Sequence, residues 1–262
     1  MMNFTINTVL TEEVTKLDHV LSPADFQGTL SQKRLVQDYL KNVVNWIGEK
    51  STLAQGLSKT LTSTDKLRNS EHILYLLKDA AGNNGQGQVI GILKIGVKSL
   101  YLYDESMKCL KVNPLCILDF YILEEYQKKG CGKKLFDYVL ADQCTTVDHI
   151  AIDNPSLKFE NFLHKHYNIG KLVRQPNCFA VSARFFENVQ SMNGEKETKA
   201  NQSSSKVSEA KYIEWPSSRE VGPVSQGSSN DVTSYGTTSS KPTPSRFRNS
   251  NFNLKYSHNK LW

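Results

Sequence analysis

Apolar residues recur in the N-terminal part of this 262-residue chain at the spacing of a long helix. The residues at intervals of three or four are Val36, Leu40, Val43 and Ile47. They predict a helix over 30–48. Thr29 and Gln32 form a candidate capping box at its start, and Gly48 is its expected stop. The polar segment 51–70 that follows predicts a loop with at most one short helix.

Shorter apolar segments, rich in β-branched and aromatic residues, predict the strands of a sheet. In chain order they are the start marked by Phe4, Ile6 and Val9, then 72–79, 88–104, 115–122, 149–153 and 177–183. Segment 115–122, LCILDFYI, is apolar almost throughout, so we expect it to be covered on both faces.

Two further helices are expected after this buried strand. The first carries its apolar stripe at Leu135, Phe136, Val139 and Leu140. The second opens with Asn154 as its N-cap and Pro155 as its first residue, and it turns Phe159 and Phe162 inward. Strands and helices in this order predict an α/β or α+β domain, with a mixed β-sheet flanked by helices.

Composition divides the chain near residue 190. Segment 190–262 is dominated by Ser, Thr, Asn, Lys and Gly and buries too little apolar surface to fold, so it predicts a disordered tail. We expect one folded domain at 1–189. The tail holds ten Lys and Arg against six Asp and Glu, which places +4 of the net charge of +6 there. This charge favours an acidic partner, but a solvated linker explains it equally well.

The cysteine pattern and the apolar runs limit the compartment. Five cysteines without a C-x-x-C pair, and a start without a secretory signal, predict a reducing compartment and no disulfide framework. No apolar run approaches ~18 residues, so we expect no membrane span. His164 and His166 point to different faces of the expected helix, and we expect no metal site.

The segment QKKGCGKK, residues 127–134, joins the buried strand to the next helix. It lacks the first glycine and the Ser or Thr of an NTPase phosphate loop, and Leu135 replaces the third glycine of a dinucleotide-binding loop. What remains is Q-x-x-G-x-G. Gly130 and Gly132 let main-chain N–H groups approach an anion, and the helix N-terminus and four lysines add positive potential. A pyrophosphate suits this site, although a glycine turn with solvated lysines has the same pattern.

Flanking motifs add a family resemblance to this element. Q-x-x-G-x-G between strand and helix resembles the coenzyme A signature of the GCN5-related N-acetyltransferases (GNATs). Further matching motifs are PLCILDF at 114–120, AIDNPS at 151–156, FLHKHYN at 162–168 and the dipeptide Ala54-Gln55. Together they resemble the α-tubulin N-acetyltransferase family. The resemblance covers most of the expected domain 1–189, which it identifies as catalytic.

The resemblance implies acetyl-CoA as co-substrate, bound in a slot that opens because the strand after the signature splays away. The implied acetyl-CoA contacts are Phe120, Tyr121, Ile122, Gln127, Lys128, Lys129, Gly130, Cys131, Gly132, Lys133, Ser156, Leu157, Lys158, Phe159 and Lys165. The family commonly has arginine and histidine where this chain has Lys128 and Cys131. Lys128 keeps the positive charge of arginine, and Cys131 keeps the main-chain N–H whatever its side chain. Binding of acetyl-CoA is therefore expected to be kept.

The resemblance also implies acetyl transfer to the ε-amino group of a lumenal lysine of α-tubulin in microtubules, by direct attack in a ternary complex. It assigns catalysis to Gln55, Cys116 and Asp153. From reference pKa values of ~8.5 and ~3.9, the Cys116 thiol is nearer the range for proton transfer and the ionised Asp153 is a host for the lysine. The alternative is that Cys116 only packs and Asp153 only helps to cap a helix.

The implied partners are α-tubulin and microtubules. Neither nucleic acid nor a second copy is expected, so a monomer is predicted. The expected location is the cytoplasm, at the cytoskeleton. Two alternatives stay open: an acetyltransferase for another lysine or a small amine, and a microtubule-binding structural protein with an added non-catalytic role.

Overall fold

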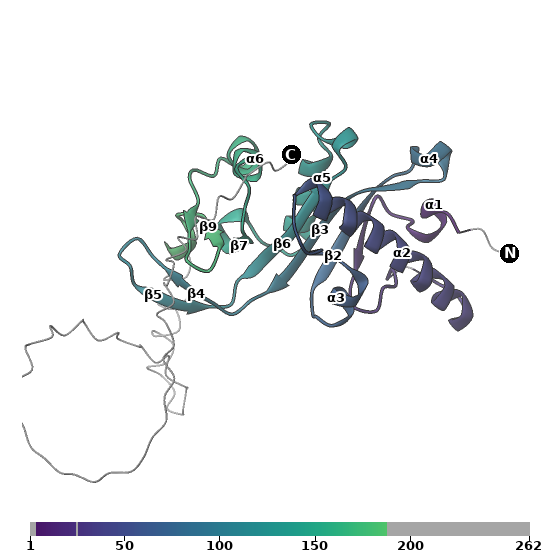
Figure 1. Cartoon of the computed structure of the whole chain (residues 1–262), viewed down its shortest axis with the longest axis horizontal. Coiled ribbons are helices and arrows are strands. Elements are labelled where there is room, and N and C mark those ends of the chain that lie inside the picture. The colour runs from purple at the N-terminus through teal and green to yellow at the C-terminus, as the bar shows by residue number, and fades with distance from the viewer. Residues whose placement is uncertain (1–3, 25, 188–262) are drawn as a thin grey trace, which may run out of the picture. The chain divides into compact units, whose positions relative to one another are not determined.

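The computed structural model describes residues 4–24 and 26–187, and the tail predicted at 190–262 lies outside them. The elements in chain order are α1 (Ile6–Val9), β1 (Val14–Leu17), α2 (Leu30–Ala54), α3 (Thr64–Arg68), β2 (Ile73–Asp79), α4 (Gly82–Gly85), β3 (Gln88–Val97), β4 (Leu100–Tyr103), β5 (Cys109–Val112), β6 (Leu115–Ile122), η1 (Glu124–Tyr126), α5 (Cys131–Asp142), η2 (Val147–His149), β7 (Ile150–Asp153), α6 (Leu157–Tyr167), β8 (Val173–Arg174) and β9 (Phe179–Val181) (Figure 1).

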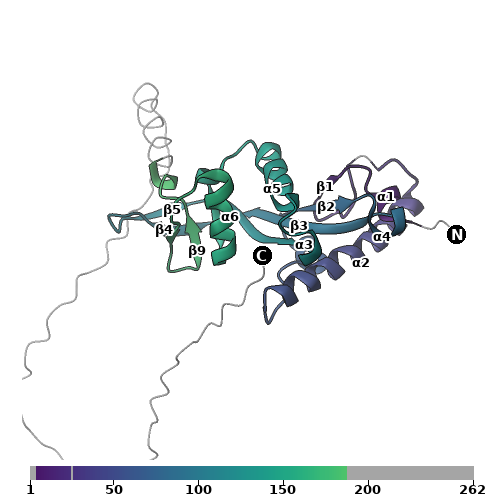
Figure 2. The same cartoon turned by 90° about the horizontal axis from the view of Figure 1, so that it is seen from above.

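Seven strands form one sheet in the order β1-β2-β3-β6-β7-β9-β8, and β4 and β5 form a separate hairpin. In this sheet β6 and β7 run parallel, and the other neighbouring strands are antiparallel. The helices α2 and α5 lie on opposite faces of it (Figure 2). A mixed sheet between helices confirms the predicted fold class.

The buried strand is where the sequence places it. β6 coincides with the predicted segment 115–122 and is buried along nearly its whole length. It lies between β3 and β7, so neighbouring strands and helices cover it. The strands β5 and β8 are only four and two residues long, which is too short for the sequence pattern to predict them.

The first predicted strand is wrong, because Ile6–Val9 is a helical turn. Thr5 and Thr8 form a capping box there. Ile6 and Val9 are both buried, and a spacing of three fits one face of a helix better than one face of a strand.

The predicted opening of the last helix at Asn154 and Pro155 is also wrong. The N-cap of α6 is Ser156, whose side chain accepts a hydrogen bond from the main-chain N–H of Phe159. Asn154 instead has a left-handed backbone with φ of 41°. The chain therefore turns sharply between the end of β7 and α6, and this turn borders the site described below.

The helix α2 begins at the predicted capping box but does not stop at Gly48. It continues to Ala54. A Cβ atom on Gly48 would lie 1.9 Å from the carbonyl oxygen of Thr62, so this glycine allows two backbones to approach closely. The two extra turns place Ser51 and Gln55 one turn apart at the end of the helix.

Four phenylalanines fix α5 and α6 against β6. Phe120, Phe136, Phe159 and Phe162 contact one another in every pairing, with ring centroids 5.4–5.9 Å apart. Five of these pairs are edge-to-face or tilted and one is stacked, and such arrangements of aromatic rings are favourable. The predicted inward faces of both helices are thus confirmed.

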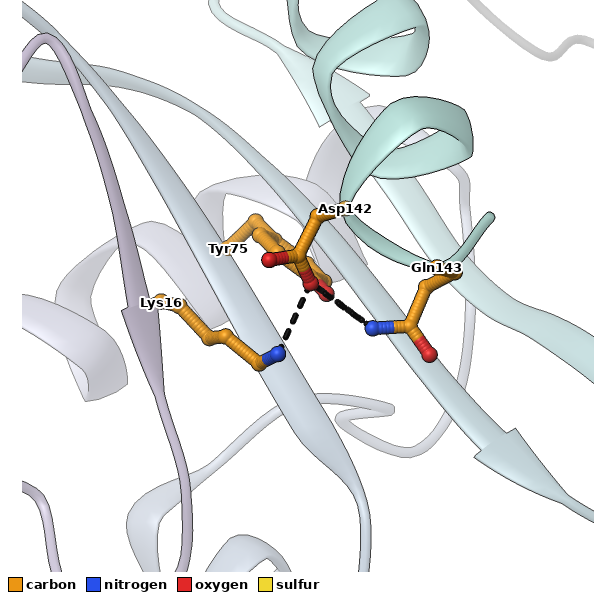
Figure 3. A network of polar contacts seen from close by, with 4 residues as sticks. All are labelled: Lys16, Tyr75, Asp142 and Gln143. Carbon is orange, nitrogen blue, oxygen red and sulfur yellow. Dashed lines mark hydrogen bonds and ion pairs between the residues drawn. The ribbon is translucent and has the colours of Figure 1, made fainter. Parts of the chain in front are cut away.

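A polar network fixes the C-terminal end of α5 to β1 and β2 (Figure 3). Asp142 Oδ2 accepts hydrogen bonds from Lys16 Nζ at 2.7 Å, the Tyr75 hydroxyl at 2.5 Å and Gln143 Nε2 at 2.7 Å. Burial alone would raise the pKa of Asp142, but the three donors together lower it below its ordinary value. We call these four residues the rear network.

Candidate active site

The parallel strands β6 and β7 pair over three positions and then separate. These positions are Leu115 with Ile150, Cys116 with Ala151 and Ile117 with Ile152. On its other side, the register of β6 with β3 shifts between Lys94 and Ile95. In the described sheet, Leu118 is therefore the extra residue of a β-bulge and pairs with neither neighbour. The splayed strands that the resemblance implies are present.

A cavity, here called the central cavity, opens where the strands separate. Its lining residues include Gln55, Leu61, Leu118, Asp119, Phe120, Asp153, Ser156 and Phe159. They come from the end of α2 and the loop after it, the middle of β6, the end of β7 and the start of α6. Two of the three expected catalytic residues, Gln55 and Asp153, thus lie in one cavity wall.

Asp119 is the polar centre of this wall, although the sequence prediction gave it no role. It is 4% exposed, and its Oδ1 accepts hydrogen bonds from Ser51 Oγ at 3.0 Å and from Gln55 Nε2 at 2.9 Å. Its Oδ2 accepts a third from Thr62 Oγ1 at 2.5 Å. Gln55 Nε2 also donates to Ser51 Oγ at 2.7 Å. The buried carboxylate is well satisfied, as burial requires. We call these four residues the front network.

Lys94 is a second buried charged residue beside the cavity. It pairs with Asp119 in the register of β3 and β6, but its Nζ donates a hydrogen bond to the carbonyl of Leu61. Burial lowers the pKa of Lys94 to about 8, while the charge of Asp119 acts in the opposite direction. A cation is therefore held near the front network without a direct ion pair to its carboxylate.

Cys116 lies on the same strand but faces a separate apolar cluster. It is fully buried among residues that include Leu102, Ala151 and Phe185. Burial raises the pKa of its thiol to about 12, although Lys98 acts to lower it. The expectation that this thiol titrates in a range useful for proton transfer is wrong, because apolar surroundings disfavour the thiolate.

The loop between β6 and α5 has the backbone that its glycines favour. Gly130 has φ of 85°, in the left-handed region that glycine adopts readily, and Lys128 has φ of 61°. Gln127 Nε2 donates a hydrogen bond to the carbonyl of Ile122 at 2.8 Å. The side chain of Gln127 therefore ties the loop to the end of β6.

The helix α5 begins without a side-chain cap, whereas Thr29 caps α2 and Ser156 caps α6. The N–H groups of its first turn remain for another acceptor. A Cβ atom on Gly132, in this turn, would meet side chains at 3.5 Å or more, which is ordinary contact. Packing therefore does not require glycine here, and the space beside Gly132 can accommodate a ligand.

The loop lines a second pocket, here called the loop pocket, which shares Phe120 with the central cavity. Its cationic lining residues are Lys128, Lys133, Lys158 and Lys165. The side chain of Lys129 lies over Tyr126 instead, and that of Lys134 forms an ion pair with Glu13. Of the four loop lysines that were expected to add positive potential, Lys128 and Lys133 therefore line this pocket and the other two do not. Two lysines of α6 complete the positive pocket.

A third pocket, here called the side pocket, shares Leu61, Leu118 and Asp153 with the central cavity. It also includes His72, and burial together with the charges of Lys98 and Lys94 lowers the pKa of His72 to about 4. His72 is therefore neutral at pH 7. The central cavity adjoins the loop pocket on one side and the side pocket on the other.

The expected acetyl-CoA contacts divide by position. Those that line the loop pocket are Phe120, Ile122, Gln127, Lys128, Gly130, Gly132, Lys133, Lys158 and Lys165. Ser156 and Phe159 line the central cavity. The remaining four, Tyr121, Lys129, Cys131 and Leu157, line neither. Tyr121 is buried with its hydroxyl donating to Glu124, and Leu157 is largely exposed.

The site includes residues that the sequence prediction missed. Asp119 and Lys94 carry the clearest signal, because each is a charged residue inside an otherwise apolar strand. Ser51 and Thr62 carry no comparable signal, since hydroxyl residues are ordinary in helix ends and polar loops.

Within the described ranges, no group of three or more His, Cys, Asp or Glu side chains is placed to hold a metal ion. In the same residues, no helix combines the length and the apolar character that crossing a bilayer requires.

The family model described as GNAT acetyltransferase, Mec-17 matches residues 2–211. An "Alpha-tubulin N-acetyltransferase" of Aedes aegypti is 37% identical over 186 residues, which cover 71% of this chain and 68% of that protein. A relative of the same name from Trichoplax adhaerens is 38% identical over 193 residues, with 70% and 81% covered. "Alpha-tubulin N-acetyltransferase 1" of Danio rerio is 39% identical over 184 residues, but the match spans only 61% of that protein.

Proposed function

Because this chain belongs to the Mec-17 family of GNAT acetyltransferases, we propose that it transfers acetyl from acetyl-CoA to the ε-amino group of a lumenal lysine of α-tubulin in microtubules. The observation that carries the proposal is the series of three adjoining pockets. The loop pocket offers cations and helix N–H groups, the central cavity lies between separated strands, and the side pocket meets it at Asp153.

The loop pocket suits the pyrophosphate of acetyl-CoA. Lys128, Lys158 and Lys165 supply charge, and the uncapped first turn of α5 supplies N–H donors beside Gly132. From there the acyl arm follows Phe120 into the central cavity. The bulge at Leu118 interrupts the strand pairing at the point where main-chain groups are needed for the thioester carbonyl.

The acceptor lysine enters from the side pocket. A free lysine has pKa ~10.4, so the neutral amine at pH 7 lies about 4.6 kcal/mol above the ammonium. Asp153 lines both the side pocket and the central cavity, and its negative charge attracts the lysine ammonium. The ammonium then loses one proton to solvent. The amine nitrogen then bonds to the carbonyl carbon of the acetyl group, and the carbon–sulfur bond breaks. A second proton passes from the nitrogen to the departing sulfur, so coenzyme A leaves as a thiol. No acyl-enzyme is needed.

Mass spectrometry tests the substrate. The full chain, incubated with isotopically labelled acetyl-CoA and assembled microtubules, should label one lysine of α-tubulin, while histone peptides and polyamines stay unlabelled. Labelling of those controls in preference to microtubules would favour the broader acetyltransferase. Microtubule co-sedimentation without any labelling would favour the structural protein. The proposal places the chain on microtubules in the cytoplasm, as a monomer.

Two substitutions separate the expected catalytic residues. Asp153→Asn should lower kcat/KM for microtubules about 100-fold, because the charged host for lysine is lost, while acetyl-CoA binding by calorimetry stays within about twofold. Cys116→Ala should lower kcat/KM less than about tenfold, through packing, because its thiol is too weak an acid for this role. Near-normal turnover in Asp153→Asn would remove that residue from the mechanism.

The acetyl-CoA site has a matched control within its own loop. Lys128→Met should weaken acetyl-CoA binding about fivefold, whereas Lys129→Met, which removes the lysine beside it that lies over Tyr126, should change it less than about twofold. Gly132→Val should weaken binding more than either, because its side chain occupies the space of the pyrophosphate. Unchanged affinity in Gly132→Val would contradict the assignment of the loop.

A further inference from the structure

The two ends of the Gln55 carboxamide have different surroundings. Nε2 donates hydrogen bonds to Ser51 Oγ and Asp119 Oδ1, so both of its hydrogens have an acceptor. Both side-chain hydrogen bonds of Gln55 within residues 4–24 and 26–187 start from Nε2, and none ends on Oε1. Gln55 lines the central cavity, and its unpaired oxygen is the polar atom that it can offer there.

Asp119 decides this orientation. An ionised carboxylate only accepts hydrogen bonds, and Asp119 already accepts from the hydroxyls of Ser51 and Thr62. If the carboxamide of Gln55 turned over, Oε1 would lie against Oδ1 of Asp119, and two acceptors would face each other in a buried setting. Such an arrangement leaves two buried oxygens without a proton between them, which is costly.

We infer that Asp119 is a positioning residue that holds Gln55 with Oε1 toward the central cavity, so that Gln55 accepts a hydrogen bond from the incoming amine. The inference rests on the proposed acetyl transfer and names the chemistry of one contact in it. It excludes the opposite role for Gln55, donation to the acetyl oxygen, because the two hydrogens of Nε2 are already bound. An acceptor at this position selects substrates that bring an N–H group.

Variants that exchange the amide of residue 55 and the carboxylate of residue 119 test the inference. Gln55→Glu alone sets two carboxylates against each other, and Asp119→Asn alone lets the carboxamide of Gln55 adopt either orientation. Each should lower kcat/KM for microtubules about tenfold or more, mainly through KM for tubulin, with KM for acetyl-CoA unchanged. In the double variant, the amide of residue 119 donates to the carboxylate of residue 55. An oxygen faces the cavity again, and kcat/KM should return to within about threefold of the wild type.

The rear network offers a matched control, because Gln143 Nε2 donates to Asp142 in the same kind of pair. Asp142→Asn, Gln143→Glu and their double variant should leave both KM values within about twofold. A front double variant that folds but is no more active than its single variants would overturn the inference, as would wild-type kinetics in Asp119→Asn.

If Asp119→Asn does not fold, Gln55→Met decides, since it keeps the length of the side chain and removes the acceptor. Its KM for tubulin should rise about tenfold, and a normal KM overturns the inference. Absence of tubulin acetylation by the wild type would instead refute the proposed function, so the two failures are distinguishable.

Discussion

Asp119 and Asp142 each accept three hydrogen bonds from side chains, but their surroundings differ in exposure and in the charge of the donors. Asp119, in the front network, is 4% exposed and takes its bonds from two hydroxyls and a carboxamide. The side chain of Asp142, in the rear network, is 27% exposed, and one of its donors is the ammonium of Lys16.

We conclude that the rear network stabilises the fold, whereas the front network positions side chains of the candidate active site. In the rear network, burial acts to raise the pKa of Asp142, but the hydrogen bonds from Lys16, Tyr75 and Gln143 together lower it below its ordinary value. Beside the front network, the cation Lys94 bonds to a main-chain carbonyl instead of to the carboxylate, and burial lowers the pKa of Lys94. Buried charges without direct pairing reduce stability, and proteins keep them where function requires them.

Removal of each carboxylate gives the largest contrast. Asp119→Ala removes the acceptor of two buried hydroxyls, those of Ser51 and Thr62, and one of the two acceptors of Gln55 Nε2, so kcat/KM should fall about 100-fold and the free energy of unfolding by about 3 kcal/mol. Asp142→Ala should lower the free energy of unfolding by about 1 kcal/mol and leave kcat/KM within about twofold. Urea denaturation and microtubule acetylation measure both, and equal losses of activity would erase the distinction.

The buried cation beside the front network, Lys94, should make the free energy of unfolding depend on pH. The pKa of Lys94 is about 8 in the folded protein and 10.5 in the unfolded chain, so the folded protein binds fewer protons between these values. The free energy of unfolding should therefore rise as the pH rises from about 8 to about 10.5, and Lys94→Met should remove up to ~3 kcal/mol of this rise. Identical slopes in the two proteins would contradict the lowered pKa.

Gly48 links the helix to the front network, and its substitution should have an intermediate effect. Gly48→Ala brings a methyl group against the main-chain carbonyl of Thr62, so Thr62 must move. This movement weakens the hydrogen bond from the Thr62 hydroxyl to Asp119. We expect a loss of about 2 kcal/mol in unfolding free energy and a measurable fall in activity. Gly56→Ala, where an added Cβ would meet nothing within 4 Å, controls for the glycine itself, although its φ of 62° adds some strain. A stabilised Gly48→Ala protein would contradict the close approach.

Tyr75→Phe should have the smallest effect. It removes one of the three donors to Asp142 and the acceptor of a second Gln143 bond, and it leaves the bonds from Lys16 and Gln143 to Asp142 in place. The free energy of unfolding should fall by about 0.5 kcal/mol, and acetylation should stay unchanged. A thermal melt beside an activity assay checks both, and a clear loss of activity would show that the rear network acts on the site.

The parts of the molecule that depend on local patterns could be predicted from the sequence. β6 and the glycine loop before α5 follow from an apolar run and a Q-x-x-G-x-G motif, and both lie where the sequence places them. The end of α2 could not be predicted in this way. Gly48 has the residue type of a stop, but a distant backbone at Thr62 explains its presence, and that contact is invisible in a local reading.

The same limit applies to side-chain directions in the site. Lys128 and Lys129 are neighbours with the same chemistry, yet only Lys128 lines the loop pocket, because the left-handed turn directs them differently. Asp119 could have been singled out as a charge inside an apolar strand. Its partners could not, since Ser51 and Thr62 reach it only through the helix extension and the loop that follows.

The short seam between β6 and β7 has a mechanical consequence. Three residue pairs join a four-stranded half of the sheet to a three-stranded half, and beyond them the halves have no ladder in common. A molecule bound between β6 and β7 beyond these pairs contacts both halves of the sheet. Because it binds only while the halves stay together, tighter binding makes local opening between β6 and β7 less favourable. Amide hydrogen exchange at the ends of β6 and β7 should therefore slow on ligand binding more than in β1 or β2.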